Sequence, residues 1–293
     1  MKQEFKDYLL FVFVLTILNF SGPLAVFLPL PFFIFKDKFS FKTLVLTSFI
    51  PLLIIFPFLP DRLSLFASFL HYGCLVIPTL TIIYLFKYTA LSPFYRVFIS
   101  SLSILVFILI LSFISTLVIG NDFFLAIFEQ FFKTSNLDKG DLKYLQDVFY
   151  YAGYGLVFFS EAMFFLFNTV FFSKVSGVLR DFENYKADIF LVVFTVFFIF
   201  SVNILWILNL LSGIILQVVA TISLFIFFVF FVQGLSIYLF FLNKVGFSGF
   251  AKTVSLVLIF IYPLPAILAL LGILDFWIDF RLKINKIGGG KLV

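Results

Sequence analysis

The sequence is poor in charge. Asp, Glu, Lys and Arg make up 12% of its 293 residues, whereas 63% of the residues are hydrophobic. A soluble domain carries about 25% charged residues, so this composition excludes an ordinary soluble fold. The basic residues behind the formal net charge of +5 are dispersed among short loops. That distribution is typical of topology determinants rather than of a nucleic-acid surface, and no nucleic-acid partner is expected.

Cysteine and histidine are almost missing. The single cysteine, Cys74, excludes an internal disulfide, and the single histidine, His71, argues against a His/Cys metal site. The sequence also lacks the P-loop pattern, the His-Glu-x-x-His motif and the Gly-x-Ser-x-Gly elbow. We therefore expect no metal, no cofactor and no catalytic set, and an intramembrane enzyme is the least favoured class of function.

Long charge-free windows dominate what is present. A charge at the bilayer centre costs at least about 2.5 kcal/mol, so such windows mark segments that cross a membrane. They do not alternate apolar and polar residues as barrel strands do, and they predict an all-α polytopic transmembrane helical bundle. A single integral membrane domain over 1–293 with eight or nine segments is expected. The segments are 8–35 (one kinked helix or two halves), 43–60, 63–86, 97–120, 149–173, 188–210, 213–243 and 253–275.

Prolines interrupt the first and last segments. Pro29 with Pro31, and Pro263 with Pro265, predict kinked or broken helices, because proline removes a backbone donor and clashes with the preceding turn. A packing kink and a discontinuous helix that lines a site both fit this pattern. The 121–148 loop carries phenylalanines on one helical face and predicts an interfacial helix.

The basic residues of the short loops bear on orientation. If 8–35 crosses twice and the N-terminus is cytoplasmic, the basic loops around 36–42, 87–96, 174–187 and 244–252 all face the cytoplasm. The basic C-terminal tail then lies outside, against the same rule. A hairpin in the last segment would return the tail to the cytoplasm, so the side of the C-terminus stays open.

Glu161 is the sharpest polar feature of the predicted spans. It lies 14 residues after Asp147 and 13 before Lys174, which places it near the bilayer midplane. Asn168 follows seven residues later on the same helical face. Glu161 is either a substrate, proton or cation contact, or a neutral hydrogen-bonded acid that joins two helices.

Four further polar residues lie in the predicted spans. Each could form an interhelical hydrogen bond worth about 0.6 kcal/mol, or all could line a polar cavity with Glu161 and Asn168. A transport role predicts that most of them converge on one cavity, whereas a scaffold predicts that they are dispersed. These candidates are His71, Asn203, Gln217 and Gln233.

The last third carries a distinctive pattern. Val232-Gln233-Gly234-Leu235-Ser236 is followed by a short basic loop, a proline-bearing span and Gly-x-x-Asp-x-Trp-x-Asp-x-Arg over residues 272–281. This pattern resembles the YybS-like family of bacterial membrane proteins, whose activity is not settled. The general shape is similar to the substrate-binding S components of energy-coupling-factor transporters, by analogy of fold alone. The resemblance implies a multi-pass protein of the bacterial cytoplasmic (inner) membrane.

The same C-terminal residues have a physical interpretation. Asp275 and Asp279 are expected on one helical face, with Asp279 paired to Lys283. Trp277 suits the membrane interface, and Arg281 can extend its charge toward water. The pattern indicates an interfacial anchor that ends the last helix, or else a docking surface for a partner protein.

Two functions follow from these features. The first is a transport component that binds a small molecule among its helices and depends on an energising membrane partner, since the sequence lacks a P-loop. The second is a non-transporting scaffold or assembly factor for envelope or division machinery. The expected partners are the lipid bilayer, a small-molecule substrate, and an energising or envelope membrane protein.

Overall fold

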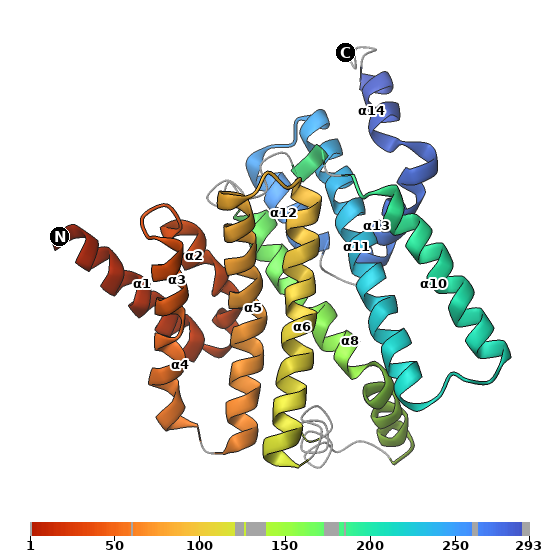
Figure 1. The fold of residues 1–293 in the computed structure, drawn as a ribbon. Helices are drawn as coiled ribbons and strands as arrows, with labels where there is room; N and C mark the ends of the chain where they lie inside the picture. The colour runs from red at the N-terminus through yellow and green to blue at the C-terminus, as the bar shows by residue number, and fades with distance from the viewer. Residues whose placement is uncertain are drawn as a thin grey trace. The chain divides into compact units, whose positions relative to one another are not determined.

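The computed structural model describes residues 2–59, 61–120, 126, 139–172, 182–184, 186–259 and 263–288. Over these ranges every regular element is a helix and no strand occurs, which confirms the predicted all-α fold (Figure 1). The sequence predicts an interfacial helix in the loop 121–148. Residues 121–138 of this loop, apart from residue 126, lie outside the described residues. Its last ten residues, 139–148, belong to a long helix.

The described residues include six helical stretches long and apolar enough to cross a membrane. Two more helices, joined at a bend, would make a seventh span if they are counted as one. Each of the six stretches overlaps one of the predicted segments, although several have charged residues near their ends that the predicted segments leave out. The six stretches are Phe41–Phe58, Arg62–Tyr88, Pro93–Val118, Lys143–Phe171, Ile189–Ile207 and Gly213–Val245.

The chain divides into two compact units. Unit one comprises Met1–Leu91 and Tyr95–Val178, and unit two comprises Ser92–Phe94 and Leu179–Val293. The elements of unit one are α1 (Lys2–Phe20), η1 (Gly22–Phe27), α2 (Pro29–Phe35), α3 (Phe41–Ser48), α4 (Ile50–Ile55), η2 (Phe56–Phe58), α5 (Arg62–Tyr88), α6 (Pro93–Ile119) and α8 (Lys139–Phe171).

Proline and aromatic residues shape the start of unit one. The 8–35 window covers most of α1 together with η1 and α2 in place of one continuous helix, and Pro29 occupies the first turn of α2. This position suits proline, since the first turn needs no backbone donor. Phe11 of α1 packs edge-on against Phe32 of α2, with ring centroids 5.2 Å apart, and tilted against Phe35 at 5.3 Å. Part of the phenylalanine excess therefore joins short helices to one another.

Helix α5 runs through the middle of unit one and contacts α2, α3 and α8. Asp61 caps its N-terminus: Oδ1 accepts the Ser64 backbone N–H at 2.7 Å, and this bond lowers the pKa of the Asp61 carboxyl. The helix continues through Pro78 and ends at Tyr88. Because α5 packs against other helices on several faces, residues on two of its faces can contribute to two separate sites.

Unit two is organised around a close pair of helices, α11 and α13 (Figure 1). Helix α12 is bent by 97° relative to α13, and residues 260–262 between them lie outside the described part of the chain. The elements of unit two are η3 (Phe182–Asn184), α10 (Ile189–Ile207), α11 (Gly213–Val245), α12 (Gly249–Ile259), α13 (Leu264–Ile278) and α14 (Phe280–Gly288).

Two glycines allow α11 and α13 to approach closely. A Cβ atom placed on Gly234 would lie 1.8 Å from the carbonyl oxygen of Leu268, and one on Gly272 would lie 2.1 Å from that of Phe230. Small residues at helix contacts have this role in membrane proteins, where the hydrophobic effect does not drive helices together. The glycines of the C-terminal sequence pattern are therefore packing residues.

We predict that Gly234→Ala destabilises the protein by about 2–3 kcal/mol, because the added methyl group meets backbone that cannot move aside as a side chain would. Gly249→Ala is the matched control, since a Cβ at Gly249 meets no atom within 4 Å. Unfolding in a denaturing-detergent titration measures both variants. Equal stability of the two variants would contradict the assigned role of Gly234.

Candidate functional site

His71 of α5 and Glu161 of α8 form a hydrogen-bonded pair inside unit one. His71 Nδ1 lies 3.0 Å from Glu161 Oε1, although 90 positions separate the residues in sequence. The Glu161 side chain is 10% exposed and that of His71 37% exposed. The sequence identified both residues as candidates, but helical periodicity could not show that α5 and α8 pack together.

Glu161 lies far from the charged N-terminal end of α8. Fourteen residues separate Glu161 from Asp147 within α8, which corresponds to about 21 Å along the helix axis. Ionisable residues inside membrane-spanning helices are rare and usually pair with one another or face a polar cavity. The distance between His71 Nδ1 and Glu161 Oε1 fits two arrangements. In one, the His71 ring N–H donates to a Glu161 carboxylate; in the other, a protonated Glu161 donates to the ring nitrogen. The pair can therefore hold or transfer one proton.

One oxygen of Glu161 has no hydrogen-bond partner among the described residues. Glu161 Oε2 is buried and accepts no hydrogen bond from the residues that the structure describes. A buried acceptor without a donor typically costs 1–3 kcal/mol, so such groups call for an explanation beyond stability. In a membrane-spanning helix, an unpartnered acceptor beside a His–Glu pair is suited to a proton, a cation or a donor group of a ligand.

Asn168 has a different environment from Glu161. Its Nδ2 donates to the carbonyl oxygen of Val26 at 2.6 Å and to that of Phe164 at 2.9 Å, and thereby ties η1 to α8. Its buried Oδ1 finds no donor among the described residues. Asn168 lies two helical turns, about 10 Å, from Glu161 along α8. Glu161 Oε2 and Asn168 Oδ1, which both lack a donor in the described part of the chain, thus lie along one stripe of the helix.

Two further candidates lie in unit two. Asn203 is exposed on α10, and its Nδ2 donates to the Ile199 carbonyl oxygen of the same helix at 2.7 Å. Gln217 is partly buried in α11, where Thr221 donates to its backbone carbonyl oxygen. The Asn203 amide thus serves its own helix, which is the usual arrangement for a polar residue that faces lipid.

A buried polar network joins α11, α13 and α14 in unit two. Asp275 has no exposed surface, and its Oδ2 accepts hydrogen bonds from Gln233 Nε2 at 2.7 Å and from Arg281 Nη1 at 2.9 Å. Its Oδ1 accepts the Phe280 backbone N–H at 3.0 Å. Charge-assisted bonds of this length are among the strong ones. Both oxygens of this carboxylate are satisfied, unlike those of Glu161.

The network extends to the segment that precedes α10. Arg281 Nη2 donates to Ser236 Oγ at 2.8 Å, and Arg281 Nε donates to the Glu183 carbonyl oxygen at 3.1 Å. Ser236 Oγ donates to the Phe182 carbonyl oxygen at 2.8 Å. Gln233 Oε1 accepts the Ala187 backbone N–H at 2.7 Å. The network thus holds four elements of unit two together.

The C-terminal motif differs from its expected form. Asp275 and most of Arg281 are buried, so Asp275 is accessible to neither a headgroup nor a docked protein. Trp277 is exposed, as a membrane-interface residue would be. Asp279 does not share a helical face with Asp275, because α13 ends at Ile278 and Asp279 has a φ of 44°.

Asp279 pairs with Lys186 at 3.1 Å rather than with Lys283. Partial burial acts to raise the pKa of the Asp279 carboxyl. The backbone N–H of Leu282 and the Lys186 ammonium outweigh that effect and hold the pKa below its usual value.

Sequence reasoning did not identify Ser236 or the backbone carbonyls that complete the network. A signal existed for Ser236, which lies three residues after Gln233 and therefore on the same face of α11. The carbonyl partners carried no sequence signal. Among the described residues, His, Cys, Asp and Glu side chains form no group of three or more that could hold a metal ion.

Comparisons with protein-family models, curated proteins and solved structures find no match for this chain.

We predict that Asp275→Ala destabilises the protein by about 3–5 kcal/mol, because it leaves the Arg281 guanidinium and the Gln233 amide buried without their acceptor. Lys186→Ala removes a more exposed ion pair and is expected to cost no more than about 1 kcal/mol. Thermal or detergent-induced unfolding measures both. A loss for Asp275→Ala as small as for Lys186→Ala would exclude the network as a stabilising element.

Proposed function

We propose that the chain is a small-molecule-binding transport component of a membrane, in which the His71–Glu161 pair binds the ligand. The observation that supports this proposal is the buried carboxyl group of Glu161, which has one oxygen on His71 and the other without a donor among the described residues. A group kept for packing alone would be expected to have both oxygens satisfied, as Asp275 has.

The chemistry of the pair suggests the class of ligand. A carboxyl group with a free acceptor oxygen recognises a cation or a hydrogen-bond donor, such as an ammonium group or a proton. Its partnership with histidine would let the pair change protonation when the ligand arrives or leaves. Because the sequence lacks a P-loop, energy would come from an ion gradient or from a partner subunit.

The setting of this component is also part of the proposal. We place it in the bacterial cytoplasmic (inner) membrane as one membrane domain, with eight or nine segments and proline-broken first and last segments. Membership of the YybS-like family, and a distant likeness to S components of energy-coupling-factor transporters, belong to the same proposal. The separate helices α1, η1 and α2, and the bend between α12 and α13, support the broken segments.

A scaffold or assembly factor is the second candidate. The observation in its favour is that several polar residues are occupied at separate places. Gln233 serves the Asp275 network, Asn168 ties η1 to α8, and Asn203 bonds to its own helix. Such dispersal is what a scaffold predicts. The transport proposal therefore depends on His71 and Glu161 rather than on a cavity shared by all six candidates.

Mass spectrometry of small molecules that co-purify with the protein tests the transport proposal. We expect a ligand with a cationic or hydrogen-bond-donating group in the wild type, and at least about a tenfold loss in Glu161→Gln, which cannot ionise. Asn203→Ala serves as the control, because Asn203 is exposed and bonds to its own helix. Profiles that are empty or identical in wild type and Glu161→Gln would instead favour the scaffold.

A further inference from the structure

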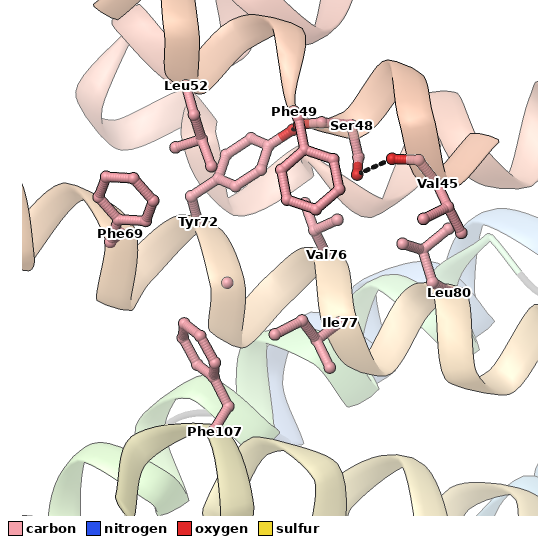
Figure 2. Close-up of a pocket in the computed structure, with 11 residues that line it drawn as sticks. Val45, Ser48, Phe49, Leu52, Phe69, Tyr72, Val76, Ile77, Leu80 and Phe107 are labelled. Carbon is pink, nitrogen blue, oxygen red and sulfur yellow. Dashed lines mark hydrogen bonds between the residues drawn. The ribbon is translucent and has the colours of Figure 1, made fainter. Parts of the chain in front are cut away.

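A second site lies on another face of α5, apart from the His71–Glu161 pair. A cavity of about 330 Å³ opens between α3, α4, α5 and α6 within unit one. Phe69, Tyr72, Val76 and Leu80 form its α5 wall, at spacings of three and four that define one helical stripe. Val45, Phe49 and Leu52 face them from α3 and α4, and Phe107 comes from α6 (Figure 2).

The cavity offers almost nothing polar to a ligand. Among the described residues that line it, Ser48 and Tyr72 alone carry a side-chain hydroxyl. Ser48 Oγ donates to the Val45 carbonyl oxygen at 2.7 Å, and the Tyr72 hydroxyl donates to the Ser48 carbonyl oxygen at 2.6 Å (Figure 2 shows the Ser48 bond). Apolar cavities of this kind exclude water and accept apolar guests. The fitting ligand is therefore a hydrocarbon.

The helix break at Phe49 gives the cavity its outer wall. Pro51 lies in the first turn of α4 and has no backbone N–H, so α3 ends at Ser48 and α4 begins at Ile50. Phe49 stands at this break and is 55% exposed, while it also lines the cavity. Its neighbours Leu46 and Leu53 are exposed as well. In a helix pair of this apolar character, such a surface faces lipid tails.

The inner wall is well hidden from that surface. Tyr72 is 2% exposed and Val76 3% exposed. Gly73 lies against the Phe107 ring, where an added Cβ would come within 2.2 Å of the ring carbon Cζ. Phe107 thus packs on the α5 backbone and closes the cavity on the α6 side. A guest that enters beside the exposed Phe49 would meet Tyr72 and Val76 on the opposite wall.

We propose that this cavity is a lipid site that holds part of one acyl chain of a bilayer phospholipid, which enters beside Phe49. Its volume lies at the lower end of the range for ligand cavities, which suits one chain and not a whole lipid. The hydrocarbon at its mouth supplies the occupant at high concentration. The headgroup stays outside, because the cavity has no free polar group to receive it.

Photolabelling tests this lipid site. The full chain is reconstituted in phosphatidylcholine vesicles that contain a phosphatidylcholine with a diazirine in the middle of one acyl chain. After irradiation and proteolysis, mass spectrometry locates the adducts. We expect adducts on the hidden stripe of Tyr72 and Val76, in addition to those on lipid-exposed residues of α6. The absence of adducts on the stripe, with α6 labelled normally, would overturn the proposal.

Variants that fill the cavity make the test sharper. Val76→Phe should reduce labelling of the α5 stripe at least about fivefold, because the larger ring occupies the space of the chain. Val106→Phe is the matched control, since Val106 is exposed on α6 and does not line the cavity. Leu80→Phe replaces Val76→Phe if circular dichroism shows that the latter does not fold. Unchanged labelling of the stripe in a folded, filled variant would contradict an acyl chain in the cavity.

Discussion

A buried polar group in hydrocarbon must find its partner inside the protein, because lipid offers none. The two buried carboxyl groups among the described residues meet that constraint differently. Asp275 has both oxygens bound, by Gln233, Arg281 and the Phe280 backbone. Glu161 has one oxygen on His71 and a second that is buried without a donor among the described residues. This contrast separates an acid that holds helices together from one suited to bind something else.

The constraint also explains the shape of unit two. The network around Asp275 requires α11 and α13 at very short distance, which Gly234 and Gly272 permit. The turn at Asp279 then directs Arg281 back toward Asp275 and Ser236. Packing, turn and ion pair depend on one another, so the Gly-x-x-Asp-x-Trp-x-Asp-x-Arg pattern has a structural reason before any functional one.

Sequence reasoning located long apolar helices because charged residues are costly in a membrane, so that stretches with few charges indicate where such helices lie. It also identified Glu161, His71 and Gln233 as residues that need partners. It could not pair His71 with Glu161, since periodicity describes the faces of single helices and not which helices meet. It assigned Asp275 and Arg281 to a membrane surface, because the left-handed turn at Asp279, which turns Arg281 inward, has no signature in hydropathy. The cavity behind Phe49 could not be predicted from the sequence either, since its walls are ordinary apolar residues.

The central claim is that the His71–Glu161 pair is present for binding and not for stability. The unfolding free energy of the double variant His71→Phe/Glu161→Leu, measured in a detergent titration against wild type, tests it most directly. We predict a stability equal to that of the wild type or about 1 kcal/mol above it, because the variant replaces a partly buried and incompletely satisfied pair with apolar groups of similar size. A loss of about 3 kcal/mol or more would show that the pair holds α5 and α8 together, and would contradict the claim.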